Sequence, residues 1–330
     1  MPKIVRFYQT GGPEVLRVEE APSEQPKANE VHIQVQAIGL NRAEALFRQG
    51  AYFEQPVLPS RIGYEISGII DAVGPGVTAF KAGDKVSTVP GYSQSRYGAY
   101  GESALAPLDS VVRYPDNLSP TQAAAIWMQY LTAWGGLIYR GKLKAGQAVL
   151  IPAASSSVGL AAIELTKLAG ATAIACTRTS GKKQALLDFG ADAVIVSQEE
   201  NLPEAVTKIT SGRGANLIFD PVGGKFVETL AQAAAREALI LEYGSLSGEP
   251  TPFPLLAAFQ KAFNMSAYTL MEVKAQPELY KTGVEYVYEH LKSGKLKPVI
   301  DHKSFSLGQI ADAHRYMESN QQFGKIVVTV

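Results

Sequence analysis

The sequence predicts an α/β protein in which a doubly wound parallel sheet is joined to a β-rich domain. Short apolar runs alternate with helical segments from residue 148 to residue 243, as in a parallel sheet with helices on both faces. Residues 1–120 instead contain alternating strands interrupted by Pro and Gly, which favours a small irregular barrel. A length of 330 residues is sufficient for two such domains.

Alternation and turn residues predict the elements of the first part. In the segment 31–38, Val31, Ile33 and Val35 share one face, as in a half-buried strand. A helix is expected at 41–49, directly after that strand. The other expected strands lie at 3–8, 15–19, 66–73, 85–89 and 100–106.

The second part begins where Ser119 can cap a helix that opens with Pro120. The apolar stretch through residue 137 predicts two helices broken near Gln129. A strand, a turn of small residues, a helix and a second strand then fill 148–176 and form a βαβ unit. The elements expected after it are helices at 182–189, 203–209 and 225–235 and strands at 193–196, 217–219 and 238–243.

The last segment predicts a return to the first domain. Its expected elements are a strand at 264–270, helices at 277–293 and 306–318 and a strand at 325–330. We therefore expect one domain made of residues 1–120 and 265–330, split by an inserted nucleotide-binding domain of residues 121–264.

The small-residue turn of the βαβ unit indicates a dinucleotide site. Backbone N–H groups can approach a diphosphate closely at such a turn, and the helix dipole favours its negative charge. Only Gly159 remains of the G-x-G-x-x-G fingerprint, so a turn that merely packs the helix closely on the sheet is the alternative. The predicted diphosphate-binding residues are Ser155, Ser156, Ser157, Val158 and Gly159.

The end of the next strand favours NADP(H) over NAD(H). An NAD site usually has Asp or Glu about 20 residues after the fingerprint, whereas here stand Thr177, Arg178, Ser180 and Lys182. Arg offers a fork of donors and Lys a point charge, and both suit a 2′-phosphate. The alternative is a solvated basic start to the next helix.

Composition argues against several classes of function. The 31 basic and 31 acidic side chains balance, which argues against nucleic acid as a partner. The sequence contains no run of about 18 apolar residues, so no membrane span is predicted. The N-terminus lacks the apolar core of a signal peptide. Cys176 is the single cysteine, so an intrachain disulfide and a Cys-rich zinc site are impossible and a cytoplasmic location is expected.

Several short motifs follow one another along the whole chain. They include Asn41-Arg42-Ala43-Glu44, Gly63-Tyr64-Glu65-Ile66-Ser67-Gly68, Val73-Gly74-Pro75-Gly76-Val77, Tyr130-Leu131-Thr132-Ala133, Phe219-Asp220-Pro221-Val222-Gly223-Gly224 and Gly324-Lys325-Ile326-Val327. In this order they resemble the medium-chain dehydrogenase/reductase superfamily, and in particular its zinc-independent quinone oxidoreductases. The resemblance implies a GroES-like barrel domain and a Rossmann domain that binds NADP(H).

The departures from that superfamily limit the chemistry. Its alcohol dehydrogenases hold a catalytic zinc with a Cys, the His of a G-H-E motif and a later Cys or acid; by resemblance, Asn41 and Tyr64 stand at the first two positions, so no metal is expected. The histidines, which match no ligand position, are His32, His290, His302 and His314. Hydride transfer is then expected to an acceptor that is already electrophilic, such as a quinone or an α,β-unsaturated carbonyl.

Other functions stay open at this point. An enone, alkenal or enoyl-thioester reductase could use the same scaffold. An alcohol dehydrogenase is the family-level alternative. A non-catalytic protein that binds NADPH as a structural or sensing ligand is an alternative of another class.

The resemblance also implies roles for individual residues. Asn41 is expected to contact the nicotinamide ribose or amide, with a helix cap as the alternative. Tyr52 is expected to line the acceptor pocket, where its phenol could donate to a developing oxyanion, with core packing as the alternative. Glu44 and Arg48 are expected to form an i,i+4 pair. The other cofactor contacts that the resemblance implies are Gln129, Thr132, Val222, Gly244, Ser245, Leu246 and Lys325.

The expected strand at 264–270 also suggests an assembly. In the resembling family the cofactor domains commonly pair through an edge strand of this region, and an apolar edge is expected to be covered. A homodimer is therefore expected. The nearby aromatic residues Phe253, Phe259 and Phe263 are expected to shape the acceptor pocket or to belong to the core.

Overall fold

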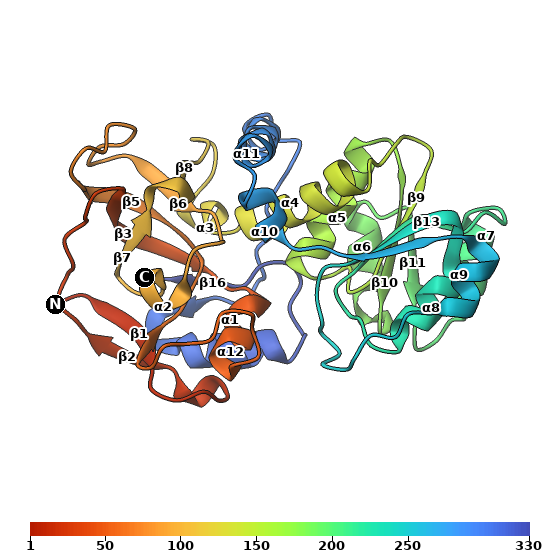
Figure 1. The fold of residues 1–330 in the computed structure, drawn as a ribbon, viewed down its shortest axis with the longest axis horizontal. Coiled ribbons are helices and arrows are strands. Elements are labelled where there is room, and N and C mark those ends of the chain that lie inside the picture. Colours follow the sequence, from red (N-terminus) through yellow and green to blue (C-terminus); the bar gives the residue numbers. More distant parts are fainter. The chain divides into compact units, whose positions relative to one another are not determined.

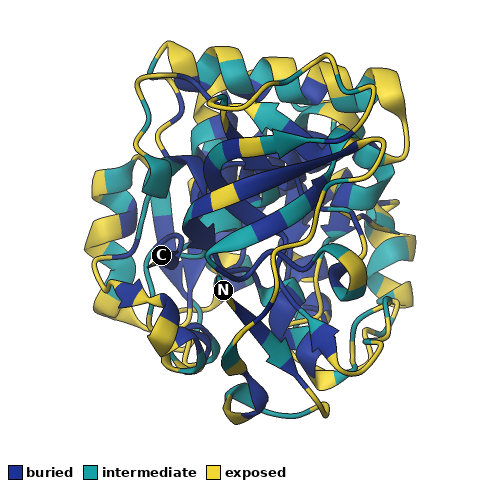
Figure 2. Cartoon of the chain, turned by 90° about the vertical axis from the view of Figure 1, so that its left-hand side faces the viewer, coloured by how far each residue is buried: buried dark blue, intermediate teal, exposed yellow.

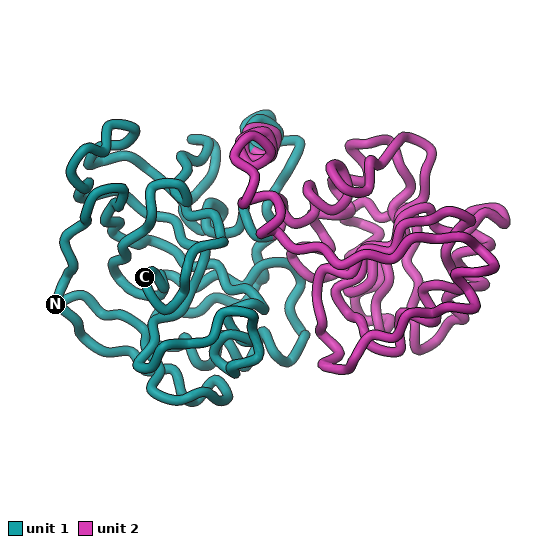
Figure 3. The backbone as a smooth tube through the Cα atoms, in the orientation of Figure 1, with its two compact units in different colours: residues 1–128, 288–330 teal, residues 129–287 magenta.

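The computed structural model describes all residues from Met1 to Val330, and the chain forms two compact units (Figure 3). We call residues 1–128 with 288–330 the barrel unit, and residues 129–287 the sheet unit. The predicted domain boundaries, at 120/121 and 264/265, lie earlier in the chain. The difference after residue 264 arises because strand β14 (Asn264–Ala267) pairs with a strand of the sheet unit and so belongs there.

The barrel unit contains two sheets. In the larger one the strand order is β15-β16-β3-β5-β6-β8, with β7 paired to β3, and the smaller one has the order β2-β1-β4. The long strands β3 and β5 pair with register shifts that bend them, as irregular barrels require. The strands are β1 (Lys3–Phe7), β2 (Arg17–Glu20), β3 (Glu30–Gly39), β4 (Ser60–Arg61), β5 (Glu65–Val73), β6 (Lys85–Thr88), β7 (Ser103–Pro107), β8 (Val111–Arg113), β15 (Phe305–Ser306) and β16 (Val327–Thr329).

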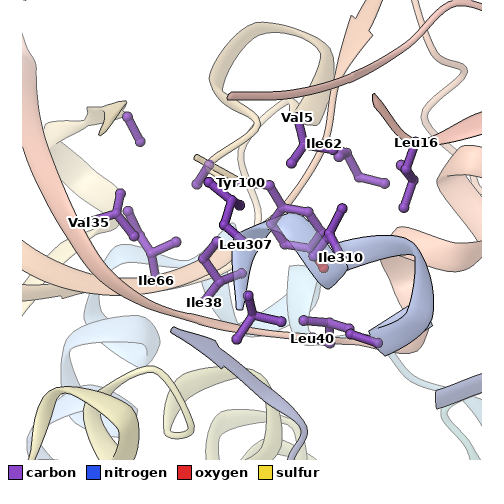
Figure 4. Packing of buried hydrophobic residues seen from close by; sticks show 14 of the residues in the cluster. Val5, Leu16, Val35, Ile38, Leu40, Ile62, Ile66, Tyr100, Leu307 and Ile310 are labelled. Atoms are coloured by element: carbon purple, nitrogen blue, oxygen red, sulfur yellow. The ribbon is translucent and has the colours of Figure 1, made fainter. Parts of the chain in front are cut away.

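The core of the barrel unit is apolar and draws on both ends of the chain. Buried positions follow its strands, while helices and loops carry most exposed ones (Figure 2). Residues from β3 and β5, such as Ile38 and Ile66, pack with Leu307 and Ile310 from the C-terminal segment (Figure 4). The helices are α1 (Arg42–Gln49), α2 (Gln94–Tyr97), α3 (Pro120–Ala123) and α12 (Ile310–Glu318), with short 3₁₀ turns at Pro13–Val15, Leu108–Ser110 and Leu307–Gln309.

The sheet unit is a doubly wound parallel sheet, which confirms the predicted fold class (Figure 1). Its strand order is β11-β10-β9-β12-β13-β14. From β9 the chain first builds outward to β10 and β11 and then continues on the other side with β12, and such sheets bind ligands at this switch point. All its strand pairs are parallel. The strands are β9 (Ala148–Ile151), β10 (Thr172–Thr177), β11 (Ala193–Val196), β12 (Ala215–Asp220), β13 (Ala234–Glu242) and β14.

Helices connect these strands. The helices of the sheet unit are α5 (Ser157–Leu168), α6 (Lys183–Phe189), α7 (Leu202–Ile209), α8 (Phe226–Ala233), α9 (Leu255–Lys261) and α10 (Leu270–Lys274). Two more, α4 (Trp127–Ala133) and α11 (Pro277–Lys292), contain a unit boundary, and α4 continues into a π-helix at Trp134–Arg140. None of the helices combines the length and the apolar character that crossing a membrane requires.

Two expected elements are wrong in detail. The break between the helices at 120–137 lies between Ala123 and Trp127, not near Gln129. It falls there because a distant carboxylate, Glu65, binds the N–H groups at the start of α4. The strand expected at 264–270 ends at Ala267, since Thr269 is extended and precedes α10.

Candidate functional site

The turn between β9 and α5 has the geometry of an anion-binding helix start. Ser156 is the N-cap of α5, and its side chain accepts a hydrogen bond of 3.1 Å from the Gly159 N–H. A Cβ on Gly159 would stand 2.6 Å from the carbonyl oxygen of Ala154, so only glycine allows this close approach. Ser155, Ser157 and Val158 are half-buried around it. The turn thus places small, half-buried residues at a helix N-terminus.

One of the cationic residues predicted after β10, Lys182, lies next to that turn. Lys182 is half-buried, and its Nζ donates to Ser155 Oγ at 3.2 Å. Arg178 and Ser180 are exposed, while Thr177 is buried at the strand end. The structure therefore brings the diphosphate turn and one of the predicted 2′-phosphate contacts together.

Two loops at the carboxyl ends of β12 and β13 also meet. The Leu246 N–H donates to the Pro221 carbonyl at 2.9 Å, and the Ser247 N–H donates to the Val222 carbonyl at 2.9 Å. Gly244 lies against Pro221, with its ideal Cβ position 2.8 Å from that carbonyl oxygen. The predicted contacts Val222, Gly244, Ser245 and Leu246 thus share one edge of the sheet, where parallel sheets bind ligands.

Gln129 and Thr132 lie on α4 and are buried. The Oε1 atom of Gln129 is shielded from solvent and has no hydrogen-bond partner. Buried polar atoms are normally paired, so this acceptor is an exception within α4.

The barrel unit holds a second group of predicted residues, a buried polar cluster around Lys325. Lys325 Nζ lies 2.6 Å from Glu65 Oε2 and also donates to Asn41 Oδ1, and the Lys325 and Glu65 side chains are fully buried. Asn41 donates from its backbone N–H to Glu44 Oε2 at 2.6 Å and from its Nδ2 to Glu44 Oε1 at 3.1 Å. Asn41 is therefore the N-cap of α1, in a capping box with Glu44, as the structural alternative expected.

Glu65 links this cluster to α4. Its Oε1 accepts N–H groups from Ile126, Trp127 and Met128 at 3.0, 2.5 and 3.3 Å, which are the otherwise unpaired donors of the helix start. Burial raises the pKa of Glu44 to about 7, against the opposing pull of Lys325 and Asn41. The cluster holds one ammonium against two carboxyl groups in the interior.

Tyr52 and Tyr64 form an aromatic contact in the barrel unit. Their ring centroids are 6.4 Å apart, and Tyr64 in turn packs edge-on against Tyr92 at 5.4 Å. Tyr64 is buried and Tyr52 half-buried, and burial raises the pKa of both phenols, so both stay protonated at neutral pH. Both therefore offer O–H donors rather than phenolates.

The expected contact between Glu44 and Arg48 is wrong, and the part that Glu65 plays was not expected. Arg48 does not pair with Glu44; it bonds Glu318 at 2.6 Å and the Gly11 carbonyl at 3.0 Å, because Glu44 is engaged by Asn41. Glu65 lies in the motif Gly63-Tyr64-Glu65-Ile66-Ser67-Gly68. Neither its ion pair with Lys325 nor its capping of α4 has a local sequence signal.

The expected absence of a metal site can be compared with the side chains. No group of three or more His, Cys, Asp or Glu side chains is arranged to hold a metal ion. His32 bonds Asp71, and His314 is buried beside Arg48. Burial also raises the pKa of the Cys176 thiol to about 12, which makes it a poor ligand at neutral pH.

Family models match both units of the chain. The alcohol dehydrogenase GroES-like domain matches residues 27–116, and the zinc-binding dehydrogenase domain matches residues 189–328. The "Quinone oxidoreductase-like protein 2 homolog" of Nematostella vectensis is 33% identical over 99% of this chain and 88% of its own length. "Quinone oxidoreductase 1" of Escherichia coli is 32% identical over 97% of both chains.

Solved structures show the same fold. The Escherichia coli quinone oxidoreductase complexed with NADPH has a TM-score of 0.92 and 29% identity, covering 99% of this chain and 100% of that one. An NAD-dependent alcohol dehydrogenase has a TM-score of 0.92 and 31% identity, with 99% of each chain covered. The enoyl reductase CurK has a TM-score of 0.88 and 26% identity, also with 99% of each chain covered.

Proposed function

Because the chain belongs to the quinone oxidoreductase-like branch of the medium-chain dehydrogenase/reductase superfamily, we propose that it is an NADPH-dependent oxidoreductase. Its substrate would be a quinone or another conjugated carbonyl. The observation that carries the proposal is the full-length similarity to an enzyme whose solved structure contains NADPH. The turn, the cations and the unpaired Gln129 acceptor support it independently.

The sheet unit supplies the binding groups for NADP(H), which provides a hydride when bound. The turn 155–159 at the start of α5 is the proposed diphosphate site. Within it the Ser156 N–H already donates to the Ala153 carbonyl and the Gly159 N–H to Ser156 Oγ. Lys182 is held beside this turn by Ser155, and Arg178 is exposed nearby for a 2′-phosphate. The amide of Gln129 and the loop residues Val222, Gly244, Ser245 and Leu246 are the proposed contacts of the nicotinamide half.

The proposed chemistry uses no zinc. Asn41 and Tyr64 stand where alcohol dehydrogenases of the superfamily are expected to place ligands, and both are engaged in protein contacts: Asn41 with Glu44, and Tyr64 with the rings around it. Without a Lewis acid, an aldehyde carbonyl would be a poor acceptor, whereas a quinone or enone is already electrophilic. The O–H of Tyr52 is the proposed donor to the oxygen on which negative charge develops.

Asn41 and Lys325 have a more structural part in this proposal. Both ends of the Asn41 amide are engaged, by Lys325 at Oδ1 and by Glu44 at Nδ2. These bonds hold the Asn41 amide in one orientation. Lys325 sets that orientation and neutralises Glu65, which caps α4 just before Gln129.

Enoyl or enone reduction is the second candidate. It is favoured by the similarity to an enoyl reductase over nearly the full chain. Both candidates need hydride transfer from NADPH and proton delivery to the reduced acceptor. They differ in the acceptor, because an enoyl reductase must also accommodate a thioester chain.

A homodimer and a cytoplasmic location complete the proposal. Strand β14 pairs only with β13, which leaves its outer edge available to a second copy. The adjacent helix α9 exposes Leu256 and Phe259 by 77% and 75% of their surface, which suits a covered interface. Phe253 is also exposed, whereas Phe263 is buried as part of the core. The cytoplasmic location rests on the reduced, buried Cys176.

An acceptor panel tests the proposal. NADPH oxidation should be followed by nicotinamide absorbance with quinones, enals, enoyl thioesters and simple aldehydes, each with and without EDTA. We expect turnover of quinones or enals that EDTA leaves unchanged, and little turnover of aldehydes. Loss of activity in EDTA would contradict the zinc-free chemistry, and a preference for enoyl thioesters would favour the second candidate.

A further inference from the structure

Asp220 and Glu242 occupy equivalent places at the carboxyl edge of the sheet unit. Each is the last residue of its strand, β12 or β13, and the two are register partners across that parallel pair. Register partners in a parallel sheet project to the same face, so the two carboxyl groups are neighbours. They lie where the second half of a doubly wound sheet binds its nucleotide.

The hydrogen bonds of the two groups are unequal. Asp220 accepts the Val222 N–H at 2.8 Å and the Gly223 N–H at 3.0 Å. Both carboxyl oxygens of Glu242 are shielded from solvent, and neither receives a hydrogen bond from an N–H or cationic donor. Two carboxylates in such a place cannot both ionise without a large electrostatic cost.

The surroundings supply no compensating cation. The titratable groups whose pKa is also raised by the charge of Asp220 are Cys176 of β10 and Tyr243, which follows Glu242, and burial keeps both neutral near neutral pH. Burial, and after it the neighbouring Asp220, together raise the pKa of Glu242 to about 8. The proton is best described as belonging to the pair.

The pair lies directly under a turn that the proposed function uses. Gly223 has a left-handed backbone with φ of 64°, and Glu242 Oε2 lies 3.7 Å from the ideal Cβ position of this glycine. The carboxylate of Asp220 fixes the same turn through two N–H groups. A second negative charge at Glu242 would therefore act on this turn and on the proposed cofactor contact Val222.

We propose that Asp220 and Glu242 share one proton beneath the turn at 222–223, and that loss of this proton weakens dinucleotide binding. Glu242 is then a positioning residue: with its proton it bridges to Asp220 and holds the turn. Without the proton, two carboxylates oppose each other below the turn that carries Val222, a proposed contact of the nicotinamide half, at the same sheet edge as the proposed diphosphate site. The inference rests on the proposed binding of NADPH.

The experiment measures the Kd of NADPH for the full chain by nicotinamide fluorescence at pH 7 and pH 9. If NADPH binds only to protein that holds the proton, a pKa of about 8 sets the fraction of protein able to bind. This fraction falls from about nine-tenths at pH 7 to about one-tenth at pH 9. We expect binding about tenfold weaker at pH 9. NADH should show the same ratio, because the pair lies in the half of the sheet that does not bind the 2′-phosphate.

Two variants make the result specific. In Glu242→Gln, which cannot ionise, the Kd should differ by less than about twofold between the two pH values. Glu249→Gln makes the same change at an exposed position of the neighbouring loop and should keep the tenfold change. A wild type that binds equally at both pH values, or a Glu242→Gln variant that keeps the tenfold change, would overturn the proposal.

A measurement without nucleotide separates this inference from the proposed function. Carbon NMR of chain labelled at the glutamate carboxyl carbons should show one group titrating near pH 8 that is missing in Glu242→Gln. If that titration is absent, the shared proton is refuted. If it is present but no variant binds NADPH, the proposed function fails and the shared proton stands without a role in binding.

Discussion

Replacing Lys325 by Met should destabilise the barrel unit strongly. The Lys325 ammonium and the Glu65 carboxylate lie 2.6 Å apart with both side chains fully buried. Met fills a similar volume but leaves the Glu65 charge in the interior without its cation. Breaking a buried pair in this way costs about 3–5 kcal/mol. Glu65 keeps its three N–H donors from the start of α4, which favours the lower end of that range.

Urea unfolding followed by tryptophan fluorescence measures this loss. The chain has two tryptophans, Trp127 in the barrel unit and Trp134 in the sheet unit. A Trp134→Phe background leaves Trp127, whose Nε1 donates to Ser87, as the reporter of the barrel unit. The free energy of unfolding of Lys325→Met should be compared with its parent in that background.

The double variant Lys325→Met with Glu65→Gln is the matched control. It removes the orphaned charge while Gln still offers one oxygen to the N–H groups of α4, so it should recover about 2 kcal/mol of the loss. A loss below about 1 kcal/mol in the single variant would refute the reasoning.

Three further predictions concern the cofactor, the acceptor and acid stability. Removing Arg178 and Lys182 together should lower the preference for NADPH over NADH by at least about tenfold in Kd, since hydrogen bonds between charged groups contribute about 1.5–3 kcal/mol each; Lys183→Ala, which removes a cation paired with Glu200, should change it little. Tyr52→Phe should lower kcat by about 10²-fold and leave the NADPH Kd unchanged if its O–H donates to the oxyanion; an unchanged kcat would reduce Tyr52 to packing. Burial lowers the pKa of His314 to about 3. Between that pH and about pH 6.5, His314 is therefore neutral in the folded state but protonated in the unfolded chain. The free energy of unfolding should then fall by up to about 5 kcal/mol between pH 6.5 and pH 3, and His314→Gln should flatten that slope in acid denaturation.

Periodicity and turn residues predict the sheet unit well. The alternation of apolar runs and helical segments is a local signal, and it predicts the parallel, doubly wound sheet that the structure contains. The small-residue turn and the end of β10 are also local, and the contact of Lys182 with Ser155 brings them together.

Features that depend on residues far apart in the chain cannot be predicted from local sequence patterns. The start of α4 is set by Glu65, which lies 61 residues before Ile126, and the charge of Glu65 is balanced by Lys325, 260 residues away. The Glu44–Arg48 pair is expected from helical spacing, yet Glu44 bonds Asn41 and Arg48 bonds Glu318 instead. The pairing of Asp220 with Glu242 depends on the register of β12 and β13, which no local pattern specifies.

The central claim is that this chain binds NADPH on its sheet unit and passes a hydride to a conjugated acceptor without a metal. The most direct measurement is the rate of NADPH oxidation with a simple quinone, before and after dialysis against EDTA, beside the same assay with NADH. We expect turnover that EDTA does not change and that falls when NADH replaces NADPH. Turnover that requires added zinc, or that is faster with NADH, would contradict it.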